Sequence, residues 1–403
     1  MTLSKSSKSF IAAGQVHLTV WGVLWTLNVL VVGHLVTWDT LLWLFVIGFV
    51  GFTILGFSLH LFPFLSGKPL HVKPPQWPTF VLGEAAVVLG SIGLSGWTWA
   101  WILGATCWLL TGGLTVSTFL FDVGRRAKAR PIESETILLF AASWVFGLLA
   151  AVLWAATAWV PGLMDSPGLG LWVVGLHFYL LGQVTLLIFG VSIKMIPKAQ
   201  SVTPPQVLTK AIPYLAISGA ALIPAAMTMP LGLGLGAVAL AAIPEGVAAI
   251  LFLSCIVFLI VRAKTPKPAV FLYLVSALAL LAAGSMGASI ARDAAFSLVN
   301  AHALLALFGF VTIMIVGMSF SMLAPFQFVA HRVTLLVMRL ELAFFASVTA
   351  VAVIAYDYHA LPPMDAGLAV GVLVTAGATL LLLGSLPVIY YDWWNAWRSR
   401  THR

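Results

Sequence analysis

Histidine is the residue type through which this sequence has the clearest means of doing chemistry. Four of its nine histidines, His34, His177, His302 and His359, fall at the same predicted depth of a membrane once the chain is divided into spans. Neutral imidazole is the usual protein ligand for heme iron and for copper. The histidines therefore predict a heme or metal site, formed by the helices that carry them.

Acidic residues inside apolar runs are a second source of chemistry. Glu84, Glu245 and Glu341 each lie within such a run, and Glu245 directly follows Pro244. A carboxyl group in lipid has to be protonated, paired or hydrated. Two interpretations remain open: the three glutamates form a proton path, or they make structural pairs, such as one near Arg339 and Glu341.

The composition defines the solvent in which these residues work. Of 403 residues, 61% are hydrophobic and 8% are charged, which is typical of a polytopic membrane protein and excludes a soluble domain. The sequence predicts an all-α protein with twelve transmembrane helices, centred near residues 22, 52, 88, 110, 147, 183, 219, 247, 278, 312, 344 and 378.

One motif occurs three times and divides the chain into repeats. Two glycines eight residues apart are followed by a proline seven or eight residues later: Gly48, Gly56 and Pro63; Gly182, Gly190 and Pro197; Gly309, Gly317 and Pro325. The copies are 134 and 127 residues apart, which indicates internal repeats. We predict three four-helix pseudo-repeats within one membrane domain, residues 1–130, 131–266 and 267–403, with the motif in the second helix of each and the proline ending that helix.

Charge placement predicts the orientation. Alternate loops hold nearly all of the basic residues, whereas the loops between them hold one, Arg292, together with aspartates such as Asp293. Under the positive-inside rule, this asymmetry puts both termini in the cytoplasm of a bacterial or archaeal inner membrane. It also explains the net charge of +8 without a nucleic-acid partner.

This topology places His177 and His302 near the outer starts of the sixth and tenth spans, and His34 and His359 in or beside outer loops. His302 precedes Gly309 by seven residues and shares its helical face, where a glycine lets a flat macrocycle approach. His177 precedes Gly182 by five residues, about 140° away from that face. Strict three-fold symmetry therefore predicts that the two imidazoles do not point the same way. Interhelical hydrogen bonding is the alternative role for both.

The layout and the run His302-Ala-Leu-Leu-Ala-Leu-Phe-Gly309-Phe-Val resemble subunit I of the heme-copper oxidase superfamily, and in particular its short relatives of the NnrS type or related uncharacterised proteins. The resemblance implies that His302 binds heme and that His177 binds copper. The seventh span has no histidine and the tenth has one, so the family's complete dinuclear oxygen-reducing centre is not expected. His34 is the candidate substitute ligand.

The leading functional prediction is a membrane protein that binds heme b, with copper as a further candidate, for nitric-oxide handling or electron transfer. The candidate heme and metal ligands are His302, His177 and His34, with His359 as a further metal ligand. The partners expected are the lipid bilayer, a small gas molecule or redox partner, and a second copy or another subunit. Two alternatives remain: a cofactor-free transporter or channel with a polar site at the repeat interface, and a structural membrane subunit of a larger complex.

Overall fold

The structure is a computed structural model that describes residues 5–30, 35–66, 76–127, 134–160, 162–163, 170–264 and 269–322, together with the single residues 343, 347, 370, 373 and 374. His34, Glu341 and His359, and nearly all of the last two predicted spans, lie outside these residues. Every secondary-structure element in the described part is helical.

The first half of the chain forms α1 (Lys5–Leu30), α2 (Trp38–Trp43), η1 (Leu44–Gly51), α3 (Phe52–Ser66), α4 (Gln76–Leu94), α5 (Thr98–Ala127), α6 (Ser134–Trp159), α7 (Gly170–His177), η2 (Phe178–Thr185) and α8 (Leu186–Gln200). The remainder forms α9 (Gln206–Met227), α10 (Leu231–Arg262), α11 (Ala269–Asp293), the 3₁₀ turn η3 (Phe296–Leu298), α12 (Val299–Leu304), η4 (Leu305–Thr312) and α13 (Ile313–Met322).

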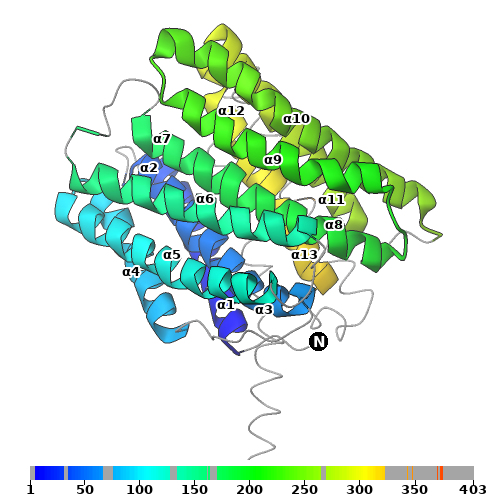
Figure 1. The fold of residues 1–403 in the computed structure, drawn as a ribbon. Helices are drawn as coiled ribbons and strands as arrows, with labels where there is room; N and C mark the ends of the chain where they lie inside the picture. The colour runs from blue at the N-terminus through cyan, green and yellow to red at the C-terminus, as the bar shows by residue number, and fades with distance from the viewer. Residues whose placement is uncertain are drawn as a thin grey trace, which may run out of the picture.

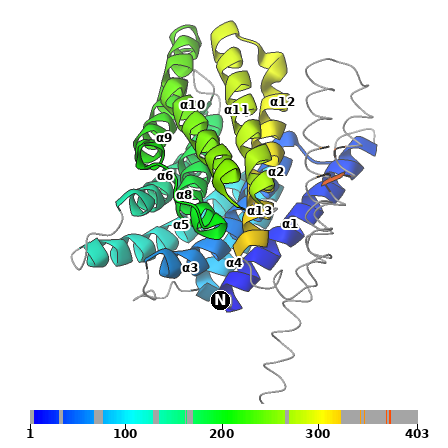
Figure 2. The same ribbon diagram turned by 90° about the vertical axis from the view of Figure 1, so that its right-hand side faces the viewer.

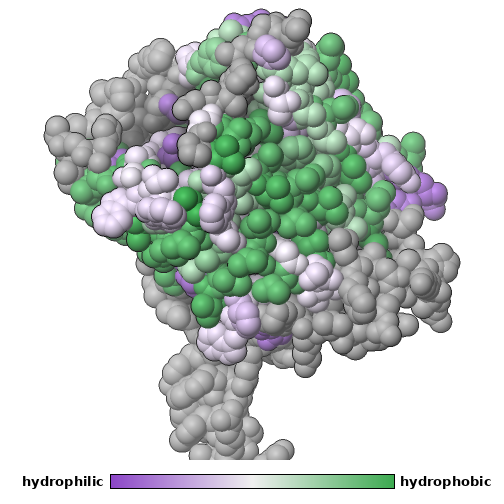
Figure 3. All heavy atoms as spheres, turned by 60° about the vertical axis from the view of Figure 1, so that its left-hand side comes forward, coloured by the Kyte–Doolittle hydropathy of each residue, from purple (hydrophilic) through white to green (hydrophobic). Residues whose placement is uncertain are grey.

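Ten helical stretches in the described residues are long and apolar enough to cross a membrane. Each contains the centre of one of the first ten predicted spans, so the chain is an integral membrane protein, as its composition predicts. Figure 3 shows apolar residues across the middle of one face and hydrophilic residues near its margins.

Three of these spans contain a π-helical segment, in which the turns are wider than in an α-helix. The segments are η1, η2 and η4, and each surrounds the first glycine of the repeated motif: Gly48, Gly182 or Gly309. They begin 134 and 127 residues apart, which are also the spacings of the motif. π-Helical segments are rare and are found frequently at functional sites.

A threonine closes two of the three π-helical segments. The Oγ1 atoms of Thr185 and Thr312 donate to the carbonyls five residues earlier, Leu180 at 2.9 Å and Leu307 at 2.8 Å. Such back-bonding satisfies carbonyl oxygens within the wide turns. The corresponding residue of η1 is Gly51, which has no side chain to do so.

The spans with π-helical segments are also the most buried. In the 18-residue windows that define them, 100% of Trp38–Leu61, 67% of Gly170–Gln200 and 83% of Phe296–Ser319 are buried, against 33–50% for the other seven. In Figure 1, α9 and α10 lie at the upper edge and α4 and α5 at the lower edge, while Figure 2 shows α10, α11 and α12 side by side. The motif helices therefore form the core.

The motif prolines lie within the last helical turn and do not follow it. Helix α3 continues three residues beyond Pro63, and α8 continues three residues beyond Pro197. Helix α8 ends at Gln200 and is capped by Ser201, whose backbone has a left-handed φ of 54° and whose N–H donates to the carbonyl of Lys198. Proline lacks the N–H that would donate to the carbonyl four residues earlier, but the residues after it can still complete the final turn. The predicted helix ends are therefore three residues too early. Pro325 lies outside the described residues.

Helices α4 and α5 pack through glycine backbones. A Cβ atom built on Gly104 of α5 would lie 2.4 Å from the backbone nitrogen of Gly90 in α4. Small residues allow this approach, which gives membrane helices their packing energy in the absence of a hydrophobic driving force between them.

Gly104→Ala is therefore expected to destabilise the protein by about 1–3 kcal/mol, because a backbone atom cannot move aside for the new methyl group. Gly113→Ala in the same helix is the matched control, since nothing lies within 4 Å of its Cβ position. Thermal unfolding in detergent measures both. Equal unfolding temperatures for the two variants would contradict the packing shown here.

Candidate functional site

The two histidines of the predicted outer site lie beside each other. The ring centroids of His177 and His302 are 6.4 Å apart, and their planes are inclined by only 10°. His177 is the last residue of α7, directly before η2, and His302 lies in α12, three residues before η4. Each imidazole is thus carried on the α-helical turn that leads into a π-helical segment.

The two histidines differ in their spacing to the motif glycines, which under strict three-fold symmetry predicts different directions within their own repeats. Both intervals cross a π-helical segment, η2 or η4, whose turns are wider than 3.6 residues. The spacings alone therefore do not fix the directions of the two side chains, and the close approach of the rings comes from the packing of the two helices.

Both imidazoles are oriented by backbone carbonyls. His177 Nδ1 donates to the carbonyl of Val173 at 2.9 Å, and His302 Nδ1 donates to the carbonyl of Ala283 at 2.8 Å. Because a carbonyl only accepts, each Nδ1 carries a proton, and the lone pair of a neutral ring is on Nε2. Neither Nε2 atom has a hydrogen bond within the described part of the chain. Metal-binding histidines show the same division of roles.

Helix α11 positions His302. A Cβ atom on Gly287 would lie 3.1 Å from His302 Cε1, so the ring rests against a glycine, one turn from the carbonyl of Ala283. Further along, Ser276 Oγ donates to the carbonyl of Phe310 and Tyr273 Oη donates to that of Gly317, each at 2.9 Å. The helix that supports the imidazole is thus tied to η4 and α13 as well.

Each imidazole can offer a metal one nitrogen lone pair, that of Nε2, because both Nδ1 atoms carry protons. The two rings lie 6.4 Å apart, centroid to centroid, with nearly parallel planes. Two neutral nitrogen donors suit heme iron or copper. No group of three or more His, Cys, Asp or Glu residues within the described ranges is placed to hold a metal ion.

The first motif helix carries tryptophan at the corresponding position. Trp43, which aligns with His177 through the repeat spacing, is fully buried, and its Nε1 donates to the carbonyl of Ala86 at 3.0 Å. Its ring lies within 5.8 Å, centroid to centroid, of those of Trp101, Trp154 and Trp172. Aromatic side chains fill this interface, and the histidine pair distinguishes the junction between the second and third motif helices.

Two of the three predicted proton-path residues, Glu84 and Glu245, lie in the described part of the chain. Glu84 of α4 contacts His17 of α1, with 3.2 Å between Oε2 and Nε2. Glu245 of α10 is buried, and neither of its carboxyl oxygens has a hydrogen-bond partner among the described residues. Within the described residues, no hydrogen bond joins Glu84 to Glu245. The proton path remains a prediction.

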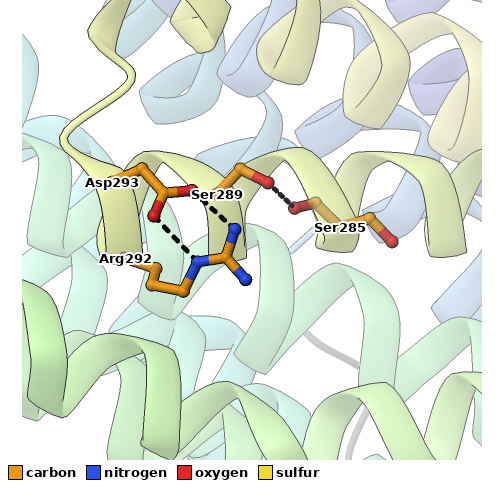
Figure 4. A network of polar contacts seen from close by, with 4 residues as sticks. All are labelled: Ser285, Ser289, Arg292 and Asp293. Atoms are coloured by element: carbon orange, nitrogen blue, oxygen red, sulfur yellow. Dashed lines mark hydrogen bonds and ion pairs between the residues drawn. The ribbon is translucent and has the colours of Figure 1, made fainter.

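The end of α11 carries a polar ridge, shown in Figure 4. Arg292 donates from Nε and Nη2 to the two carboxyl oxygens of Asp293 at 2.8 and 2.7 Å, and Ser289 Oγ donates to the carbonyl of Ser285. Ser285 lies two residues from Ala283 and therefore on the opposite side of α11 from His302. The basic residue predicted for the outer side is neutralised by its neighbour.

Sequence reasoning identified the two histidines and missed their supports. Ala283 and Gly287 belong to a segment, Ala282 to Ser289, in which every residue except Met286 is small, and such a segment signals close packing of α11. That signal does not specify which side chain the glycine accommodates. The partnership of His17 with Glu84 was also missed, because residues 67 positions apart give no pairing signal in one sequence.

Comparison with known proteins supports the fold. No protein-family model matches the chain, and no curated protein matches it. Among solved structures, the chain is similar to a heme-copper terminal oxidase determined as a dimer by cryo-electron microscopy, with a TM-score of 0.68 and 14% identity over 95% of this chain and 82% of that one. At this identity, the likeness shows a shared fold.

The contact between His17 and Glu84 is expected to stabilise the packing of α1 on α4. Glu84→Ala leaves His17 Nε2 without its partner, while Nδ1 of that ring already has none. We expect a loss of about 1–3 kcal/mol, as for other buried polar groups deprived of a partner. Glu84→Gln, which keeps an oxygen acceptor, is the control and should lose less. Equal losses in thermal unfolding would refute the interaction.

Proposed function

We propose that this protein binds heme b in the membrane, that His302 and His177 would hold the heme iron, and that the protein carries electrons. The observation that supports this function is the parallel histidine pair, 6.4 Å apart, with both Nδ1 atoms bonded to carbonyls. The similar fold of a heme-copper terminal oxidase adds support, because that architecture is known with heme and copper in another chain.

The residues present fit such a group. The ring of His302 is held by Ala283 and Gly287 of α11, and that of His177 by Val173 of its own helix. Both cysteines, Cys107 and Cys255, lie on other helices, α5 and α10, so attachment is expected to be noncovalent. The surrounding spans are apolar, which excludes water from the ligands.

Bound heme would supply a reversible one-electron change at iron. Because both His302 and His177 would hold the iron, we favour electron transfer over nitric-oxide handling. Copper remains a further candidate for His177. A copper site of three histidines would need a ligand from outside the described residues, where His34 and His359 lie.

We also propose the three-repeat organisation for the whole chain: twelve spans in residues 1–130, 131–266 and 267–403. The recurrence of a π-helical segment at the same place in three spans supports it. The asymmetry of basic loops supports an inner-membrane location with both termini in the cytoplasm and the histidine pair towards the outer side. An electron carrier so placed needs a redox partner on that side.

A visible spectrum of the purified protein, with iron and copper analysis, tests the proposed function. We expect a Soret band that shifts on reduction and the low-spin signature of two histidine ligands. His302→Ala should abolish the band or convert it to high spin, and His177→Ala should make the iron five-coordinate and open to carbon monoxide. His60→Ala, which removes another membrane histidine, is the control.

Absence of a Soret band and of stoichiometric iron or copper would reject the heme proposal. A cofactor-free transporter, a channel or a structural subunit would then be the remaining interpretations. A low-spin spectrum retained in His177→Ala would reject the assignment of that ligand and direct attention to His34.

The support from α11 gives an independent prediction. Gly287→Ala places a methyl group 3.1 Å from the ring of His302, so the ring has to turn and its bond to Ala283 weakens. We expect heme content to fall several-fold, or the spectrum to shift. Gly284→Ala, on the same helix with nothing within 4 Å of its Cβ position, is the matched control. Identical spectra for the two variants would show that α11 does not position the ligand.

A further inference from the structure

Glu245 is a buried acidic residue that takes no part in the proposed histidine site. It lies near the middle of α10, is 7% exposed, and has no hydrogen-bond partner for either carboxyl oxygen within the described residues. An ionised carboxylate in such surroundings is very costly, and it is neutralised instead. The position therefore requires a bound proton or another cation.

The fold makes room for this carboxyl group. A Cβ atom on Gly219 of α9 would lie 2.6 Å from Glu245 Cβ and 2.8 Å from its Oε2. A glycine in the middle of α9 thus leaves a slot that the acid occupies. Any larger residue at position 219 would displace the carboxyl group.

No basic side chain among the described residues is hydrogen-bonded to either carboxyl oxygen of Glu245. Lys210 of α9 lies nine residues before Gly219, and Arg262 of α10 lies seventeen residues after Glu245, which correspond to about 13 and 25 Å of helix. Helix α11 contributes Arg292, which is bound to Asp293. The remaining charges on the helices packed against α10 are Lys194 and Lys198, in the last two turns of α8.

Two prolines leave backbone carbonyl oxygens without their usual helical donors near the contact between α9 and α10. Pro224 of α9 and Pro244 of α10 have no N–H, so they cannot donate to the carbonyls four residues earlier, those of Ala220 and Leu240. Ala220 is next to Gly219, and Leu240 lies within one and a half turns of Glu245. Carbonyl oxygens freed by proline in membrane helices accept bonds from side chains and water.

We propose that Glu245 is a proton-binding site in the membrane interior, protonated at neutral pH, which exchanges its proton through the crossing of α9 and α10. We assign the proton as the ligand, because no group of three or more His, Cys, Asp or Glu side chains in the described residues is placed to hold a metal ion. The site is separate from the histidine pair and does not depend on bound heme. Helix α9 lies between the two sites: it contacts Glu245 through Gly219 and packs against η2, the segment that follows His177.

Dicyclohexylcarbodiimide, an apolar reagent that modifies protonated carboxyl groups in membranes, is the probe. The acid O–H adds across one C=N bond: the carboxyl oxygen bonds to carbon, the proton goes to nitrogen, and the adduct rearranges to an N-acylurea with no leaving group. Peptide mass spectrometry of the full-length protein in detergent locates the adduct. We expect it on Glu245, with less in alkaline buffer, and none in Glu245→Gln.

Glu135, in the first turn of α6, is the internal comparison and is expected to remain unmodified. Recovery of the Glu245 peptide without an adduct in any buffer would overturn the proposal. Infrared spectroscopy of the unmodified protein gives a second measurement. A protonated-carboxyl C=O band, absent in Glu245→Gln and shifted in D₂O, is expected, whereas no band, or a band that D₂O does not shift, would refute proton exchange. Neither measurement involves heme, so the two proposals fail separately.

Discussion

The cost of an unpaired polar group in lipid governs this fold, because it dictates which helices are neighbours. Trp43 of the first motif helix donates to a carbonyl of α4, Ser276 and Tyr273 of α11 donate to carbonyls of η4 and α13, and His302 donates to a carbonyl of α11. Lipid offers no competing partner for these donors. Each bond therefore fixes a pair of helices, and the few polar side chains in an apolar chain specify its arrangement.

Each π-helical segment separates the part of the motif helix that packs closely against its neighbours from the part that carries a different side chain in each copy. After each segment, the motif helix presents small residues for close packing; before it, the chain presents a different side chain in each copy. At the position of His177, the first copy has Trp43 and the third has Leu304. The wide turns of a π-helical segment change the rotation of the helix before it relative to the helix after it. The residue before the segment and the glycines after it can therefore contact different neighbouring helices. One scaffold thus carries an aromatic cluster at one junction and an imidazole pair at another.

Hydropathy and the glycine-proline motif were sufficient to predict an all-helical membrane protein and the positions of its first ten spans. They were not sufficient to predict the directions in which the side chains of His177 and His302 point. Helical angles calculated at 3.6 residues per turn do not hold across a π-helical segment. The contact of Glu84 with His17 on another helix was not predicted from the sequence either. Such partners depend on tertiary packing, which a single sequence does not display.

The two imidazoles differ in how they are anchored. His177 is bonded within its own helix, to Val173 one turn earlier, whereas His302 is bonded to Ala283 of a separate helix, α11. A small shift of α11 along α12 would leave the first ring unchanged and turn the second. The pair is therefore mechanically asymmetric: a movement of α11, such as one caused by a contact with the exposed polar ridge at its end, would turn His302 and leave His177 in place.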